Sequence, residues 1–342
     1  MKWLFVAVAL GLAMPVAARD LAVPADKGWK HAETGLILMP QLAGMSRTAL
    51  TDTTQAEHDV AAQYDALDKS TFATIYLFHP AIADASLWFD RSQTALEARD
   101  LFRNASPATA DPIAFAVGGA KTASSMRQVY ATPAGQYRST ALLVVPLGEW
   151  IVSVRMSAKA LTAVQLDARL QQMIAAIRWP TAVETEAPAA APMQVCMAPL
   201  TFGKAKLAKP DGADLLMSLM GGSLAAKKKA EAQSEPAVRT TWCREGDART
   251  EYGMYRSDGA SSSYVLALYD AGRVVSVYPS IMGQINKTGV YSVSLEDVEG
   301  TVSAFQSFTA LPSPKQVWSL IESRHRTGTK NGNQLTVSPK AF

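Results

Sequence analysis

The feature that most constrains this chain is a proline-rich segment, residues 180–192, which reads PTAVETEAPAAAP. Its prolines, small side chains and glutamates leave it too little apolar surface to offset the entropy lost on ordering. Prolines also favour an extended, semi-rigid spacer. We therefore expect a linker at residues 181–192, between one domain over residues 19–180 and a second domain over residues 193–342.

The first eighteen residues, 1–18, have the pattern of a signal peptide. Lys2 precedes an apolar run over residues 3–14, and small residues at 16–18 match the preference of signal peptidase. The run is shorter than the about 20 residues that a transmembrane helix needs, and an uncleaved anchor is the alternative. We expect cleavage after Ala18, a periplasmic or secreted protein, and no transmembrane span in the mature chain.

Charge argues against one class of partner. The formal net charge of the whole chain is only +3. Domains that bind nucleic acid have stronger and more patterned positive charge. We therefore expect no nucleic-acid partner, and instead a protein or another component of the cell envelope.

The two cysteines, Cys196 and Cys243, both lie in the expected second domain. An even number of cysteines in an exported protein favours a disulfide. Closing a loop of this length would stabilise the fold by about 4 kcal/mol through the unfolded chain. Two buried free thiols are the alternative, since sequence does not give the geometry of the pair.

Residues 19–180 contain β-branched and aromatic runs together with two amphipathic segments, which predicts an α+β domain. Asp84 is an expected N-cap, and Thr162 with Gln165 has the pattern of a capping box. The expected strands are 35–40, 73–78, 113–117, 127–132, 138–145 and 150–156, and the expected helices are 84–103 and 162–177.

Several of these pieces together resemble the Mog1/PsbP-like group, which includes exported bacterial relatives of the DcrB type. The resembling pieces are the GLILMP strand at 35–40, the ATIY strand at 73–76, the hairpin at 138–156, and the closing helix that runs into RWP at 178–180. The resemblance implies an accessory, partner-binding or assembly role, and it implies no shared catalytic residue.

The second domain has the pattern of a β-meander with Gly-containing turns, so we expect two domains, each an antiparallel sheet with a few packed helices. The expected strands are 193–199, 238–244, 250–256, 263–269, 273–278, 289–295, 300–308 and 334–337, and a helix is expected at 312–323.

A lysine-flanked apolar segment interrupts this pattern at residues 203–235. A short helical excursion that packs on the sheet, with its lysines in water, is one interpretation. Weak contact of residues 214–229 with an anionic lipid surface or a partner is the other.

No motif for catalysis, metal binding or cofactor binding is present. The four histidines are His31, His58, His79 and His325, and no two have the sequence spacing of metal ligands. We therefore predict no catalytic, metal or cofactor residue. The leading hypothesis is an exported, non-catalytic envelope protein that binds or helps assemble a partner. The alternative is a periplasmic hydrolase whose site forms only in three dimensions.

Tyrosines in the meander suggest where a partner would bind. Strand alternation places Tyr264 and Tyr291 on apolar faces, whereas Tyr255 shares a face with Glu251 and Gly253. Tyr269 and Tyr278 lie at strand ends. We predict that Tyr255 is exposed, that Tyr269 and Tyr278 are more exposed than Tyr264 and Tyr291, and that Tyr255, Tyr269 and Tyr278 form a binding surface.

Overall fold

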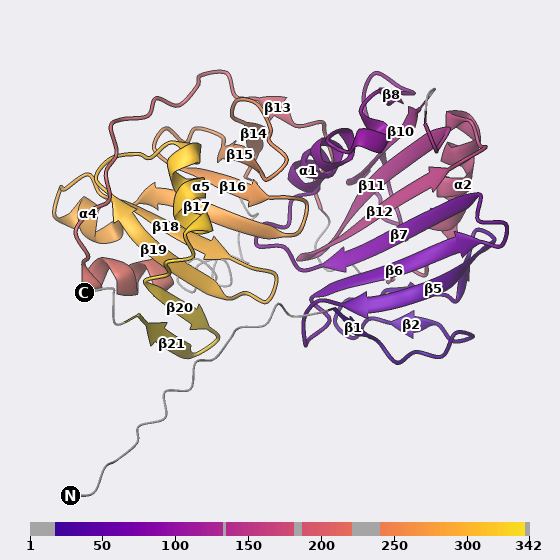
Figure 1. Cartoon of the computed structure of the whole chain (residues 1–342), viewed down its shortest axis with the longest axis horizontal. Coiled ribbons are helices and arrows are strands. Elements are labelled where there is room, and N and C mark those ends of the chain that lie inside the picture. Colours follow the sequence, from indigo (N-terminus) through magenta and orange to yellow (C-terminus); the bar gives the residue numbers. More distant parts are fainter. Residues whose placement is uncertain (1–17, 133–134, 181–186, 221–239, 339–342) are drawn as a thin grey trace, which may run out of the picture.

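The computed structural model describes residues 18–132, 135–180, 187–220 and 240–338. The chain is mixed α/β, with about 18% helix and 37% strand. Two large sheets contain most of the strands (Figure 1). Residues 1–17 of the expected signal peptide at 1–18, and the first half of the expected linker, 181–186, lie outside the described residues.

The first sheet has the order β1-β5-β6-β7-β12-β11-β10-β8, and all its pairs are antiparallel. Two short strands extend it, because β4 pairs with β5 and β9 pairs with β10. Its strands are β1 (Arg19–Asp20), β4 (Gln41–Leu42), β5 (Met45–Asp52), β6 (Asp59–Ala66), β7 (Thr71–Phe78), β8 (Ser106–Pro107), β9 (Ile113–Phe115), β10 (Ser125–Ala131), β11 (Ser139–Leu147) and β12 (Trp150–Ala158). A separate hairpin pairs β2 (Trp29–Lys30) with β3 (Ile37–Leu38).

Helices cover both faces of this sheet. Helix α2 (Ala163–Ala176) begins at the predicted capping box and packs against β10, β11 and β12. Helix α1 (Ala85–Glu97) packs against β10 and β11, and Leu87 N donates to its N-cap, Asp84, at 2.8 Å. The expected extension of this helix to residue 103 is wrong, because α1 ends at Glu97 and the 3-10 turn η1 (Asp100–Phe102) follows it.

The second sheet has the order β13-β14-β15-β16-β17-β18-β19-β20-β21. Only the pair β13–β14 is parallel, and the other pairs are antiparallel. Its elements are β13 (Gln194–Val195), β14 (Trp242–Arg244), β15 (Tyr252–Ser257), β16 (Tyr264–Leu268), β17 (Arg273–Pro279), α4 (Ile281–Ile285), β18 (Tyr291–Glu296), β19 (Val302–Phe308), α5 (Pro314–Glu322), β20 (Gly328–Asn331) and β21 (Gln334–Val337).

Strand alternation divides the second sheet between two cores. On β16, Leu266 and Leu268 belong to the core that α5 covers, through Val317. Val265 and Ala267 point to the opposite face and belong to a core that also contains residues of α1. Helix α1 therefore lies between the two sheets and packs on both (Figure 1).

A buried polar network accompanies this shared core. Arg91 on α1 is fully buried, and its guanidinium donates to the carbonyls of Tyr269 at 2.6 Å, Arg249 at 3.0 Å and Thr250 at 2.9 Å. Burial lowers the pKa of Arg91. Because the three acceptors are carbonyls on the second sheet's β14–β15 and β16–β17 connections, Arg91 fastens α1 to both connections.

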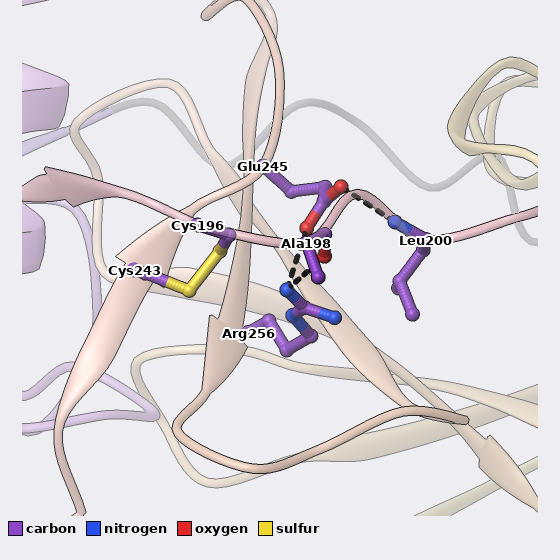
Figure 2. The surroundings of a disulfide bond; sticks show 6 residues. All are labelled: Cys196, Ala198, Leu200, Cys243, Glu245 and Arg256. Carbon is purple, nitrogen blue, oxygen red and sulfur yellow. Dashed lines mark hydrogen bonds and ion pairs between the residues drawn. A yellow bond between two sulfur atoms is a disulfide. The ribbon is translucent and has the colours of Figure 1, made fainter.

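The disulfide between Cys196 and Cys243 is confirmed (Figure 2). It joins the segment after β13 to β14, with a Cα–Cα distance of 5.0 Å. Polar contacts extend the same attachment: Glu245 accepts from Leu200 N at 2.7 Å, and Arg256 donates to Ala198 O at 2.5 Å. The extended segment 196–200 is therefore fixed along the edge of the second sheet.

The second half of the expected linker, residues 187–192, contacts the part of the chain that contains the first sheet. Ala190 N donates to Ala123 O at 2.9 Å, and Ala190 packs against the core that contains α1. Within residues 187–192, Ala190 is therefore in contact with the folded part of the chain, while Pro188, Ala189 and Ala191 are exposed.

The apolar part of the lysine-flanked segment forms a helix over residues 212–220. Leu215 and Leu219 pack against Val302 and Ala304 on β19, which agrees with the packed interpretation. Residues 221–235 of the segment, including the lysines at 227–229, lie outside the described residues.

Candidate binding groove

The prediction that Tyr255 is exposed is wrong. Its side chain is 0% exposed and belongs to the core between α1 and the second sheet. The reason is Gly253: a Cβ at this position would lie 2.7 Å from Tyr255 Oη, so the absent side chain leaves the space that the ring occupies. Strand alternation correctly placed Gly253 and Tyr255 on one face of β15. Helix α1 covers that face, so Tyr255 is buried.

The other tyrosines of the meander differ in how far their side chains are exposed. Tyr269 is 46% exposed and Tyr264 only 2%, as predicted. Tyr278 and Tyr291 are both half-buried. Since Tyr255 lies inside the core, the three tyrosines Tyr255, Tyr269 and Tyr278 do not form one exposed surface.

A groove of about 720 Å³ lies along helix α5, and we call it the α5 groove. Six residues of α5 and its flanks line it: Ser313, Lys315, Gln316, Ser319, Leu320 and Ser323. Their spacing of three to four residues keeps them on one side of the helix. Val317 lies on the adjoining side of α5, between the helix and the sheet, and is fully buried.

The floor of the groove is apolar and comes from the sheet. Leu207 and Phe308 line it, and these two residues form an isolated antiparallel bridge. Leu207 is 50% exposed. The groove therefore offers apolar area that a ligand could remove from water.

The rim of the groove is cationic and rich in hydroxyl groups. Lys315 lies at one end of α5, and His325 and Arg326 lie beyond the other end. No aspartate or glutamate is among the residues that line the groove. Thr327 also lines it, and the buried Oγ1 of Thr327 has no hydrogen-bond partner within the described chain.

The one neighbouring Ser–His pair of the groove does not form a nucleophile and base. Ser323 Oγ donates to Leu320 O at 2.6 Å, so its proton is directed towards a carbonyl. The contact from His325 to Ser323 Oγ is made by the backbone nitrogen, at 3.4 Å. The geometry of this groove thus favours binding over hydrolysis.

A second cluster contains three of the four histidines and was missed at the level of sequence. His58 precedes β6 and His79 follows β7, and Trp150 begins the neighbouring β12. The centroids of these two imidazole rings lie 5.5 and 5.1 Å from a ring of Trp150, and that of His31 lies 4.5 Å away. Strand β6, which begins directly after His58, was not predicted from the sequence. There was therefore no reason from the sequence to place His58 beside another residue of this cluster.

His31 is the most buried member of this cluster, at 0% exposure. Burial lowers the pKa of its imidazole, although Glu33 acts in the opposite direction. Its Nδ1 accepts from Thr34 N at 3.2 Å, and its buried Nε2 has no hydrogen-bond partner within the described chain. This environment favours a neutral imidazole.

A buried carboxylate fixes the helix at 212–220. Asp214 accepts hydrogen bonds from Ser280, Ser292 and Ser307, which lie on or beside three successive strands. All three hydroxyls donate to this one carboxylate, which ties the helix to three strands near their ends. We assign this cluster a structural role.

The described ranges contain neither a candidate metal cluster nor a candidate membrane-spanning helix. In residues 18–132, 135–180, 187–220 and 240–338, no group of three or more His, Cys, Asp or Glu side chains is arranged to hold a metal ion. Among helices in the same ranges, none has the length and apolarity to cross a membrane.

Comparisons with known proteins identify no relative. No family model matches the chain, and neither a curated protein nor a solved structure is similar to it.

Proposed function

We propose that this chain is an exported, non-catalytic protein of the cell envelope that binds a partner or ligand in the α5 groove. The observation that supports this proposal is the groove itself. It has an apolar floor, a cationic rim and a size of about 720 Å³, in the range typical of ligand sites.

Export is proposed from the sequence and the cysteines. The pattern of residues 1–18 is that of a signal peptide, and the Cys196–Cys243 disulfide is typical of an oxidising compartment. The first residue after the expected cleavage site, Arg19, is engaged in the fold through an ion pair with Asp52 at 2.9 Å. This supports a mature chain that begins at Arg19.

We further propose that residues 19–180 are a Mog1/PsbP-like domain and residues 193–342 a second domain. The support is that two of the resembling pieces form as expected: the hairpin β11–β12 pairs antiparallel, and α2 closes the segment. Members of that group act mostly as accessory and assembly proteins. The α5 groove lies on the second sheet, so the partner would be held by the second domain.

A hydrolase is the less favoured function. It requires a nucleophile whose proton a base can accept. In the α5 groove, the hydroxyl of Ser323 is bonded to a carbonyl. The proposal of binding without catalysis follows from this arrangement.

A blocking substitution tests the proposal. Ser319 lines the groove and is exposed, so Ser319→Trp should fill the groove without disturbing the core. Ser261→Trp, at an exposed loop position that is not among the lining residues of the groove, is the matched control. Mature protein should capture a component from envelope extract, Ser261→Trp should capture it equally, and Ser319→Trp should not. Equal capture by all three proteins would contradict the proposal.

A further inference from the structure

We propose that the ligand of the α5 groove is an aliphatic anion, with a carboxylate or phosphate head bound by Arg326 and an alkyl chain along the groove floor. This inference rests on the proposed function and adds the chemistry of the ligand. It is carried by the distribution of charge, apolar area and an unpaired hydroxyl along the groove.

Charge decides the sign of the ligand. Lys315 and Arg326 line the groove, and no acidic side chain among its described lining residues offsets them. A cationic ligand would meet only repulsion there. A neutral ligand would make only ordinary hydrogen bonds to the rim, whereas an anion gains the stronger charge-assisted hydrogen bonds.

The position of the head follows from the groups at the two ends of α5. Lys315 stands alone at the N-terminal end, whereas His325, Arg326 and Thr327 are consecutive at the other. The planar guanidinium of Arg326 can donate two parallel hydrogen bonds to a carboxylate or phosphate. Thr327, which follows Arg326, has a buried Oγ1 with no hydrogen-bond partner among the described residues.

The helix terminus does not cancel this attraction. The last carbonyls of a helix repel anions when they lack partners. In α5, the carbonyl of Ser319 accepts from Ser323 N at 3.1 Å, and that of Ile321 accepts from Arg324 N at 3.0 Å. The carbonyl of Leu320 accepts from Ser323 Oγ. The repulsive field at the Arg326 end is therefore reduced.

Apolar residues continue from this end along the floor. Leu320 lies in the last turn of α5, Phe308 ends β19 beneath it, and Leu207 forms an isolated bridge with Phe308. Leu207 is half-exposed in the unliganded chain, so an alkyl chain would remove its surface from water. A head without a chain would use only part of the site.

Binding of defined probes to the full mature chain tests the inference. The probes are decanoate, decyl phosphate, neutral 1-decanol and butyrate, each below its micellar concentration, measured by calorimetry. We expect decanoate and decyl phosphate to bind about tenfold or more tightly than 1-decanol and butyrate. If decanoate is preferred to decyl phosphate, the head is a carboxylate; the opposite order indicates a phosphate.

Two charge-matched variants place the head. Arg326→Gln should weaken decanoate binding about tenfold, whereas Lys315→Gln at the other end should change it less than about twofold. Equal binding of decanoate and 1-decanol, or no effect of Arg326→Gln, would overturn the inference. If Ser319→Trp abolishes capture from extract but no anionic probe binds, the ligand chemistry is wrong and the binding function stands. If no anionic probe binds and Ser319→Trp still captures the component, both the ligand chemistry and the binding function of the α5 groove are contradicted.

Discussion

Tyr255 Oη donates a hydrogen bond to Asp90 Oδ2 at 2.6 Å, and this bond joins strand β15 of the second sheet to helix α1. Both side chains are buried, and Arg244 completes the group by pairing with Asp90 Oδ1 at 2.7 Å. A tyrosine expected on the surface is instead a structural link between the two sheets.

Removing this hydroxyl should destabilise the protein. Tyr255→Phe leaves the buried Asp90 carboxylate without one of its donors, so we expect the free energy of unfolding to fall by about 1–3 kcal/mol. Tyr269→Phe, at an exposed position, should change it by less than about 0.5 kcal/mol. Denaturant unfolding of both variants measures the difference, and equal stabilities would argue against the link.

The packing of Tyr255 on its own strand gives a second prediction. In Gly253→Ala the new Cβ would lie 2.7–2.9 Å from three atoms of the Tyr255 ring, and the buried ring has no room to withdraw. We expect a loss of about 1–3 kcal/mol in the free energy of unfolding.

Gly203→Ala is its control, since the nearest atom to that Cβ lies 3.4 Å away. It should leave stability unchanged or raise it by up to about 1 kcal/mol. Similar losses in the two variants would indicate that the ring of Tyr255 moves freely.

The shared core predicts how a cut chain behaves. We expect a protein whose residues 181–186 are replaced by a site-specific protease sequence to stay associated after cleavage. The apolar core around α1 and the three bonds of Arg91 hold the pieces together. Size-exclusion chromatography before and after cleavage measures this. Two separate peaks without denaturant would show that the sheets are held only by the linker.

Burial of His31 predicts a pH dependence of stability. Burial lowers the pKa of His31 in the folded chain, while an unfolded histidine titrates near about 6.5. Below that pH the unfolded state binds more protons, so this contribution is complete above the unfolded pKa and is lost as pH falls towards the folded pKa. Glu33, Asp52, His58 and the Glu57 backbone act on the same group.

Unfolding curves from about pH 7.5 to 5.5 test this contribution, because the window spans the unfolded histidine pKa. His31→Asn keeps an acceptor for Thr34 N but has no proton to gain, so its stability should fall less steeply than that of the wild type. The exposed His325→Asn should retain the wild-type slope. An unchanged slope in His31→Asn would refute the assignment.

Local chemistry made part of the fold predictable. The capping box at Thr162 and the N-cap at Asp84 set the starts of α2 and α1, and both were expected. The β11–β12 hairpin was expected from its long apolar strands. In these cases neighbouring residues carry the information.

Other elements depend on distant residues. Strands β5 and β6 were missed, because MSRTALTD and DVAAQYDA carry little strand propensity and become strands through pairing with each other and with β7. The α5 groove was missed for a related reason: its rim is near α5 in sequence, but its floor uses Leu207 from more than a hundred residues earlier.

The most direct test of the binding function is native mass spectrometry of the mature protein isolated from the exporting host without detergent. We predict a bound species on the wild type and on Ser261→Trp, and bare protein for Ser319→Trp, whose indole would fill the α5 groove. A bound species that persists undiminished on Ser319→Trp, or bare protein in all three, would contradict the account.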